Sequence, residues 1–437
     1  METSNFTDTQ LTVREAIRQV CSQFPNEYWR QCDRTETDPK GFHATLAQDG
    51  WLGIALPEAL GGAGLGISEA TMMMQTIAES GAGMAGAQAI HANVYATQPL
   101  AKFGTKDQLE STIPNIISGQ WRVCFGVTEP NAGLNTLALS TTADKQRDGS
   151  YLVTGQKIWI TCGQVASKMI LLARTTPLDQ VKKPSEGLSL FCIDLDRRAG
   201  SGLDMRKIQK LGGRAVDANE VFFDHYPIPA DSLIGREGQG FKIILHGMNA
   251  ERCLLAGEAL GLGYAALARA AQYARERVVF DRPIGQNQGI AHPLAEAYMQ
   301  LESAKLSTYH AARLYDTAIL THGGMGYAAE YDVERCFSYI CLDVAGVAKV
   351  NVQGDGSWSQ IALPQSGGCF SGCVDASMLR CFDDRQETLV LAKTNASAAD
   401  ARHLQNFVWG PHLFKQSEVF FASIFLSSKT SELQDLQ

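Results

Sequence analysis

The sequence predicts a mixed α and β protein in which a β-rich domain stands between two helical domains. Three observations support this order: helical periodicity before residue 121, short apolar runs of strand type as far as residue 234, and helical periodicity again from residue 235. We therefore divide the chain into residues 1–121, 122–234 and 235–341. The remaining residues, 342–437, form a tail without a clear period.

Apolar positions in the first domain recur at helical spacing in two blocks. Residues 11–24 form one block, and residues 67–103, which are rich in Ala and Met, form the other. Between them lie the run Gly50-Trp51-Leu52-Gly53 and the glycine-rich residues 61–64, which interrupt helices. The pattern therefore predicts two helical segments with a loop between them.

The middle domain consists of short apolar runs of strand type. Residues 151–154 and 157–161 are separated by Gly155, a pattern that predicts a hairpin. Further strands are predicted at residues 169–173, 188–193 and 221–223.

The third domain is predicted to contain two helices. Residues 241–273 carry apolar side chains on more than one face, so this helix is expected to be buried on several sides. A turn-rich link over residues 277–289 follows. A second helix is predicted from Pro293 to about Thr317.

Charge and hydropathy exclude several classes of protein. The net charge of −8 argues against nucleic acid or an anionic membrane as the main partner. We expect no membrane span, because no apolar run is long enough to cross a bilayer. Residues 1–6 have neither the basic nor the apolar region of a secretory signal. We therefore expect an intracellular protein, and the cytoplasm, the peroxisome and the mitochondrion all remain open.

The 11 cysteines are not arranged as a disulfide framework or a metal site. Six of them are scattered singly among apolar residues, and we expect these to be reduced and buried. Cys369, Cys373 and Cys381 form a cluster, but no His or Cys partner stands at a zinc-ligand spacing. The sequence therefore predicts no metal site.

The richest constellation combines residues 125–136 with the run from Lys157 to Thr161. It contains the end of a strand, a Pro turn, and Gly133, which lets a ligand approach the backbone. Trp159 offers a flat surface and Thr161 a hydroxyl group. This combination suits a planar heterocycle that needs stacking and a hydrogen bond at one ring nitrogen. The alternative for these residues is a turn beside an aromatic residue at a sheet edge.

A second constellation runs from Arg277 to Gln288. The planar guanidinium of an arginine can pair with two phosphate oxygens at once. Arg277 is therefore a candidate for binding a phosphate group, and its spacing to Gln288 in the sequence supports this function. The alternative for Arg277 is a solvated surface charge.

Glu251 is a carboxylate inside an otherwise apolar helix. Burial of a charge is costly unless the charge is paired or used in chemistry. Glu251 could therefore form an ion pair with another helix. The alternative is a general base whose pKa is raised by its apolar surroundings.

Together, residues 125–136 and 157–161 resemble the signature of acyl-CoA dehydrogenases, and the similarity extends over roughly residues 40 to 340. The resemblance implies an N-terminal helical domain, a β-barrel-like middle domain that holds FAD and the acyl-CoA, and a C-terminal helical bundle. It also implies the reaction, which is the FAD-dependent α,β-dehydrogenation of a fatty acyl-CoA thioester to the 2,3-enoyl-CoA.

The same resemblance implies roles for individual residues. Phe125, Val127 and Thr128 would face the flavin ring, with Thr128 bonded near its reactive nitrogen, and Trp159 and Thr161 would cover the other side. In many members a serine stands where this chain has Leu134, and that serine contacts both the flavin phosphates and CoA. The resemblance also implies that further residues bind FAD, either at its phosphates or in a neighbouring subunit. They are Gly133, Leu134, Arg277, Gln288, Gly323 and Gly324. The chain would then be a homo-oligomer, either a dimer or a tetramer.

Members of this family place the catalytic base in one of two positions. One is a C-terminal loop of the Tyr-Glu-Gly-Thr type, which this chain lacks, and the other is a Glu-Arg pair on the helix that carries Glu251. Glu251 is therefore the candidate base, and Arg252 joins Leu134 as a candidate contact of the substrate. Glu258 lies two turns further along but has no matching motif.

The C-terminal region departs from the family pattern. Most of a helix is missing between Thr317 and Ala318, and the last helix of the family does not follow Arg335, so the bundle is truncated or altered. A catalytically impaired relic is therefore one alternative. An acyl-CoA oxidase, which passes its electrons to oxygen, is another, although oxidases are usually longer. The Leu134-Asn135 variant and the helix with the Glu-Arg pair most resemble fungal members of the family. Some of these fungal members act in pathways that make fatty-acid-derived secondary metabolites, including host-selective toxins. This similarity implies an unusual branched or unsaturated acyl group.

Overall fold

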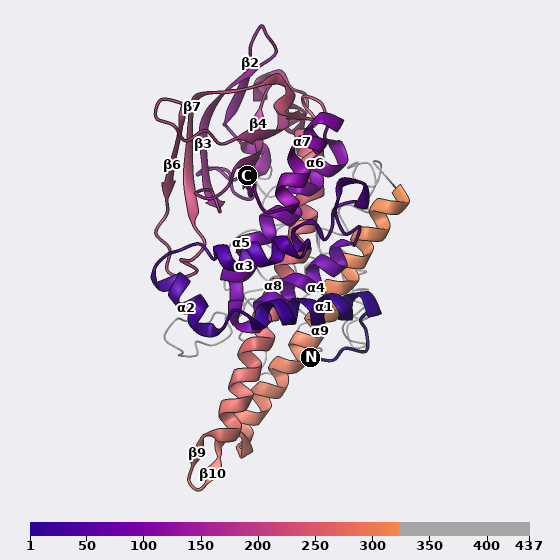
Figure 1. The fold of residues 1–437 in the computed structure, drawn as a ribbon, viewed down its shortest axis with the longest axis vertical. Coiled ribbons are helices and arrows are strands. Elements are labelled where there is room, and N and C mark those ends of the chain that lie inside the picture. Colours follow the sequence, from indigo (N-terminus) through magenta and orange to yellow (C-terminus); the bar gives the residue numbers. More distant parts are fainter. Residues whose placement is uncertain (323–437) are drawn as a thin grey trace, which may run out of the picture. The chain divides into compact units, whose positions relative to one another are not determined.

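The computed structural model describes residues 1–322, and their order is helices, sheet, helices (Figure 1). The mixed α and β fold class predicted from the sequence is therefore confirmed. Gly323, Gly324, Cys369, Cys373 and Cys381 lie outside the described residues, as does the predicted tail.

Seven α-helices form the N-terminal part of the described chain. They are α1 (Asp8–Ser22), α2 (Asn26–Arg34), α3 (Lys40–Gln48), α4 (Ile67–Ile77), α5 (Gly83–Tyr95), α6 (Thr97–Phe103) and α7 (Lys106–Ile117). The block predicted over residues 67–103 is thus divided into three helices. A π-helical turn over Ala78–Ala82 separates α4 from α5, and Gly81 adopts a φ of 109° there, which a residue with a side chain rarely adopts.

The strands form one eight-stranded sheet with the order β6-β7-β3-β2-β4-β5-β8, and β1 pairs with β4. Their bounds are β1 (Val123–Gly126), β2 (Thr142–Lys145), β3 (Tyr151–Thr161), β4 (Lys168–Arg174), β5 (Leu188–Asp194), β6 (Leu203–Lys207), β7 (Ala218–Ile228) and β8 (Leu233–Ile234). Their inward side chains form an apolar cluster separate from the core of the helices. β1 and β2 pair with β4 in parallel, and the other pairs of this sheet are antiparallel.

The hairpin predicted at Gly155 is wrong, because residues 151–161 form the single strand β3. Gly155 has a φ of 146°, and the pairing of β3 with β7 shifts between Val153 and Gly155. The glycine therefore makes a β-bulge instead of a turn. A Cβ at this position would stand 2.6 Å from Oγ1 of Thr141, so the close approach of another segment also requires glycine here.

Two long helices complete the described chain, α8 (Gly240–Glu276) and α9 (Gln288–His322). The link between them contains the two-residue strands β9 (Val278–Val279) and β10 (Arg282–Pro283), which lie together in Figure 1 beyond the N-terminal helices. Helix α9 begins at Gln288 rather than at the predicted Pro293, which lies within the helix.

Helix α8 is long and apolar enough to cross a membrane by length and composition alone, contrary to the sequence-based expectation. Within the protein, however, 61% of its most apolar window is buried. Its buried residues include Ile244, Leu254 and Leu260, which belong to the same core as α4 and α5. Burial of this helix on several sides, which its sequence predicts, is therefore confirmed.

Glycines bring α8 close to α4. A Cβ on Gly257 would stand 2.7 Å from the carbonyl oxygen of Thr71, and one on Gly261 would stand 2.2 Å from the carbonyl oxygen of Gln75. Both obstacles are backbone atoms of α4, which cannot rotate away as the end of a side chain could. The close contact of these two helices therefore depends on glycine at both positions.

We expect Gly261→Ala to lower the free energy of unfolding by about 2 kcal/mol, because the added methyl group forces the helices apart. Gly212→Ala is the matched control, since a Cβ there meets no atom within 4 Å. Denaturant unfolding of both variants beside the wild type measures the difference. Equal stabilities of the two variants would contradict this account of the α4–α8 contact.

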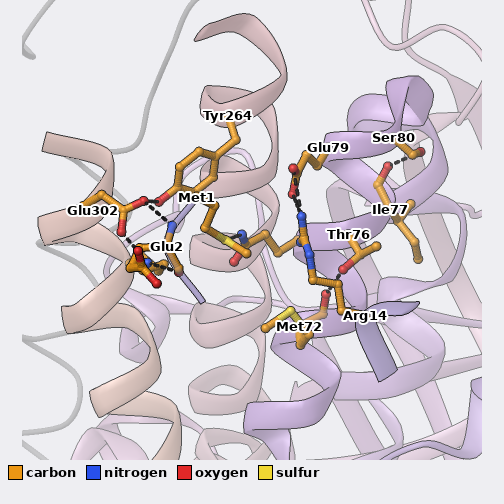
Figure 2. Close-up of polar contacts among 12 residues, drawn as sticks. Met1, Glu2, Arg14, Met72, Thr76, Ile77, Glu79, Ser80, Tyr264 and Glu302 are labelled. Atoms are coloured by element: carbon orange, nitrogen blue, oxygen red, sulfur yellow. Dashed lines mark hydrogen bonds and ion pairs between the residues drawn. The ribbon is translucent and has the colours of Figure 1, made fainter. Parts of the chain in front are cut away.

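The first residues of the chain join the N-terminal helices to α8 and α9, as Figure 2 shows. The backbone N–H of Glu2 donates to Glu302 at 3.1 Å, and the Tyr264 hydroxyl donates to the same carboxylate at 2.8 Å. Arg14 on α1 pairs with Glu79 at 2.8 Å. The two bonds to Glu302 therefore tie the segment before α1 to α8 and α9, and the ion pair ties α1 to the π-helical turn after α4.

The cysteines within the described residues agree with the expectation of reduced, buried side chains. Cys21, Cys32, Cys124, Cys162, Cys192 and Cys253 are all free and buried. Burial raises the pKa of the Cys162 thiol to about 12, so this group stays protonated at neutral pH.

Candidate active site

The loop after β1 is held in place by a buried ion pair between Glu129 and Lys157. The Nζ of Lys157, which is fully buried on β3, donates to Oε1 of Glu129 at 2.9 Å and to the carbonyl oxygen of Val127 at 3.0 Å. Glu129 also accepts the backbone N–H groups of Ser140 and Thr141 at 2.7 and 2.9 Å. Burial opposes ionisation, but Lys157 and these donors lower the pKa of Glu129 to about 2. The pair thus fixes the path of the loop.

Phe125, Val127 and Thr128 lie at the end of β1 and directly after it. The backbone N–H of Ile158 on β3 donates to the carbonyl oxygen of Thr128 at 2.9 Å. This bond joins the two segments that the sequence singled out separately. Val127 is buried, whereas Phe125 and Thr128 are half-buried.

Trp159 has an unusual backbone for a bulky residue in a strand. Its φ is 62°, and its side chain is 57% exposed. The pairing of β3 with β7 shifts register between Lys157 and Ile160, so Trp159 stands on a bulge. Positive φ at a large side chain costs free energy and is concentrated at ligand sites. Thr161, two residues on, is half-buried at the end of the same strand.

These residues fit the ring system of a flavin. Trp159 presents an exposed aromatic face, and the hydroxyl groups of Thr128 and Thr161 stand on the two segments beside it. Gly133 leaves open space, since a Cβ there meets no atom within 4 Å. Such a site offers both the stacking surface and the hydrogen-bonding groups that a planar heterocycle requires.

Leu134 is 95% exposed on the loop before a 3₁₀ turn over Thr136–Ala138. Its neighbours Gly133 and Asn135 are exposed as well. This part of the loop is therefore open to a ligand, and its leucine can offer a contact to apolar atoms but no hydrogen-bonding side chain.

Glu251 lies on α8 and is partly exposed. Burial is the main cause that raises the pKa of Glu251 to about 7, and the negative charge of Glu258 contributes in the same direction. The positive charges of His91 and Arg252 and a hydrogen bond from the Tyr95 side chain act in the opposite direction. At neutral pH a large fraction of Glu251 is therefore ionised, while its neutral form remains accessible, which is what a general base requires.

Tyr95 connects Glu251 to the loop after β1. Its side chain bonds to Glu251, and its ring packs edge-on against the ring of Phe125, with centroids 5.1 Å apart. The structure therefore brings Glu251 to the same region as Phe125. Arg252, the neighbour of Glu251, is half-buried and donates to Oδ1 of Asn249 at 2.6 Å.

Arg277 and Gln288 stand apart from this region, and both side chains are exposed. Arg277 directly follows α8 and Gln288 begins α9, so the two flank the β9–β10 link. From Glu251 to Arg277 the helix rises about 39 Å, which separates Arg277 from the residues around Glu251.

Five residues of this region carried no assigned role in the sequence-based interpretation: His91, Tyr95, Glu129, Lys157 and Glu258. Glu129 and Lys157 had a detectable signal, since one acid and one base stand inside the two halves of the same motif. His91 and Tyr95 had none, because nothing in an Ala-rich helix shows which residues face α8. Among the described residues, no group of three or more His, Cys, Asp and Glu side chains is placed to hold a metal ion.

The helical, β and helical order, together with a flavin-type site and a carboxylate of raised pKa beside it, defines a flavin-dependent dehydrogenase. Profiles of three domains match the chain: the acyl-CoA dehydrogenase N-terminal domain over residues 7–120, the middle domain over residues 124–226 and the C-terminal domain over residues 238–321. The chain belongs to the acyl-CoA dehydrogenase family, and it is an FAD-dependent oxidoreductase.

Individual relatives support this assignment. An acyl-CoA dehydrogenase of Bacillus subtilis is 32% identical over 355 residues, which cover 75% of this chain and 91% of the relative. The acyl-CoA dehydrogenase FadE12 of Mycobacterium tuberculosis is 34% identical over 322 residues, which cover 73% of this chain and 78% of the relative. The structure of butyryl-CoA dehydrogenase from Megasphaera elsdenii is similar with a TM-score of 0.66 and 27% identity, over 79% of this chain and 95% of that chain.

The family assignment made from the sequence is thus confirmed, and so is FAD as the cofactor. The extent of the similarity differs from the expectation of residues 40 to 340. It begins earlier, at residue 7, because the first helices belong to the N-terminal domain, and the domain match ends at residue 321.

We expect Trp159→Ala to weaken FAD binding by about tenfold, because the variant loses an aromatic stacking surface. Release of flavin during dialysis, followed by its absorbance, measures the effect. Leu178→Ala is the control, since Leu178 is also exposed, at 51%, in the part of the chain that contains the sheet. Equal flavin retention in the two variants would favour the alternative that Trp159 is merely an aromatic residue at a sheet edge.

Proposed function

We propose that this FAD-dependent acyl-CoA dehydrogenase converts a fatty acyl-CoA to the 2,3-enoyl-CoA with Glu251 as the catalytic base. One observation carries the proposal: Glu251 has a pKa raised to about 7 and is bonded to Tyr95, whose ring packs on Phe125 beside the flavin-type site. A carboxylate that titrates near neutral pH beside a cofactor site is the usual property of a general base.

The reaction breaks two C–H bonds of the acyl chain and forms one C=C bond. Glu251 removes the proton from Cα, and its carboxylate then carries that proton. The chemistry that a bound FAD would supply is acceptance of the Cβ hydrogen as a hydride. The electron pair left at Cα becomes the new double bond, so atoms and electrons balance.

The other residues are assigned to binding. Phe125, Val127 and Thr128 would line one side of the flavin ring, and Trp159 and Thr161 would cover the other. The Glu129–Lys157 pair supports this assignment, because it keeps the loop in one conformation before the cofactor binds. Leu134 and Arg252 are proposed contacts of the substrate. Gly133 lets the cofactor approach the backbone closely.

Arg277 and Gln288 are proposed to bind the FAD of a neighbouring subunit in a homo-oligomer. The rise of about 39 Å along α8 between Glu251 and Arg277 supports this, since one cofactor could hardly contact both ends within one chain. The exposed apolar residues Val278 and Phe280 on the link between the helices, and Tyr298 and Met299 on α9, also favour an oligomer interface. Gly323 and Gly324 keep the same predicted role.

A substrate panel tests the proposal. The purified protein is mixed without oxygen with straight-chain acyl-CoAs of short, medium and long chain and with branched ones. We expect loss of the visible flavin absorbance with at least one of them, together with formation of the 2,3-enoyl-CoA. A colourless protein that FAD does not reconstitute would favour a catalytically impaired relic. Rapid oxygen consumption without another electron acceptor would favour an oxidase. Preference for a branched or unsaturated acyl group would support a role in secondary metabolism, which remains a prediction.

A further inference from the structure

His91 on α5 and Glu258 on α8 form a buried pair that the proposed reaction does not use. Nδ1 of His91 lies 3.1 Å from Oε1 of Glu258, and the two side chains are 6% and 0% exposed. The second carboxylate oxygen of Glu258, Oε2, is buried and has no hydrogen-bond partner among the described residues. Glu258 therefore depends on His91 for compensation of its charge.

This pair lies in register with Glu251 and Tyr95. Glu251 and Glu258 are seven residues apart on α8, and His91 and Tyr95 are four residues apart on α5, so each pair shares a helix face. His91 meets Glu258 while Tyr95 bonds to Glu251, and the rings of His91 and Tyr95 pack edge-on with centroids 5.3 Å apart. A displacement of His91 would therefore move Tyr95 and, through Tyr95, alter the surroundings of Glu251.

The charges of the cluster are also coupled. Burial favours a neutral imidazole, but the carboxylates of Glu258 and Glu251 together raise the pKa of His91 above its ordinary value. The described groups that act on the charge of Glu251 are His91 and Tyr95 from α5, and Glu258 and Arg252 from α8. Glu258 disfavours ionisation of Glu251, and a protonated His91 offsets it.

We propose that His91 and Glu258 are a positioning pair for the catalytic base: the pair orients Tyr95 against Glu251, and the imidazolium cancels the nearby charge of Glu258. This inference rests on the proposed role of Glu251. Neither His91 nor Glu258 is assigned a contact with substrate or cofactor.

Three variants of the FAD-loaded protein test the pair. His91→Asn keeps a hydrogen-bond donor near the position of Nδ1 but removes the positive charge, and it leaves the carboxylate of Glu258 uncompensated. Glu258→Gln removes the negative charge. The double variant removes both charges and restores electrical neutrality. The rate of flavin reduction by the best acyl-CoA of the substrate panel is measured against pH.

We expect His91→Asn to raise the pKa of Glu251 by about one unit, because the neighbouring positive charge is lost. The rising limb of the pH profile should then move to higher pH by about one unit. At about pH 6, flavin reduction should be about tenfold slower than in the wild type. At about pH 9 its rate should approach that of the wild type, because Glu251 is ionised in both proteins there. The double variant should return to within about half a unit of the wild-type profile.

His43→Asn is the matched control, since His43 is another buried histidine in the N-terminal helices and burial lowers its pKa to about 3. It is expected to leave the pH profile unshifted. Melting temperatures supply a readout besides activity. His91→Asn should melt several degrees lower than the double variant, because a single change leaves a buried charge unpaired.

A purely structural role of His91 would lower the rate equally at all pH values, and this result would overturn the proposal. A double variant that is no closer to the wild type than His91→Asn, in either profile or melting temperature, would overturn it too. Failure of the proposed function is visible separately, because it shows as undiminished flavin reduction in Glu251→Gln.

Discussion

Glu251→Gln is expected to slow flavin reduction by an acyl-CoA by about 10²–10⁴-fold while FAD stays bound. Glutamine has nearly the same shape as glutamate but cannot accept the α-proton. The bond from Tyr95 can still be made to the amide oxygen, so the surroundings of Phe125 should be preserved. Single-turnover reduction, followed by flavin absorbance, measures the effect.

The control for this variant is Glu276→Gln, which changes a carboxylate on the same helix at its exposed end. It is expected to reduce flavin at the wild-type rate. Equal rates in wild type, Glu251→Gln and Glu276→Gln would eliminate Glu251 as the base and leave the ion-pair alternative for this residue.

The wild-type rate should also depend on the protonation of Glu251. Burial raises its pKa to about 7, and only the ionised form can take a proton from Cα. The rate should therefore rise with pH through about 7 and level off above it, and this limb should be absent in Glu251→Gln. A profile without a limb between about pH 5 and 9 would contradict the role given to Glu251.

Lys157→Met is expected to lower the free energy of unfolding by about 3–5 kcal/mol and to reduce the FAD content of the purified protein. The change leaves Glu129, 4% exposed, with a buried charge that Lys157 no longer compensates. It also removes the donor to the carbonyl oxygen of Val127, which helps to fix the loop beside the flavin. Denaturant unfolding and flavin absorbance measure the two effects.

Two further variants distinguish loss of the Glu129–Lys157 ion pair from a general effect of mutation on stability. Lys157→Met combined with Glu129→Gln should recover part of the lost stability, because no uncompensated charge remains. Lys145→Met, which breaks an exposed pair with Glu237, should leave the unfolding midpoint nearly unchanged. If all three proteins lost the same stability, the buried pair would not be the cause.

The same pair predicts how stability depends on pH. Glu129 has its pKa lowered from an ordinary value of 4.5 to about 2, so the folded state binds this proton less readily than the unfolded state. Its contribution to stability is therefore fully present above pH 4.5 and is lost as the pH falls from 4.5 to about 2. The difference in melting temperature between wild type and Lys157→Met should shrink across this window.

The sequence alone determined the order of the domains, the family and the cofactor, and it supplied the candidate segments for the site. This was possible because periodicity and motif spacing are local properties of the chain. Local patterns also have limits, as Gly155 shows. A glycine between two apolar runs is compatible with a turn or with a β-bulge. The structure shows a bulge, because β3 pairs with β7 on both sides of Gly155 with a shift in register.

The tertiary structure decided which residues surround Glu251. His91 and Tyr95 are more than 150 residues away from Glu251 in the sequence, and they face it only because α5 packs against α8, where Gly257 and Gly261 bring α4 close as well. Burial and charge then set the pKa of Glu251, and neither can be read from its neighbours in the chain. The sequence supplied Glu251 as a candidate, whereas long-range packing created the surroundings that raise its pKa to about 7.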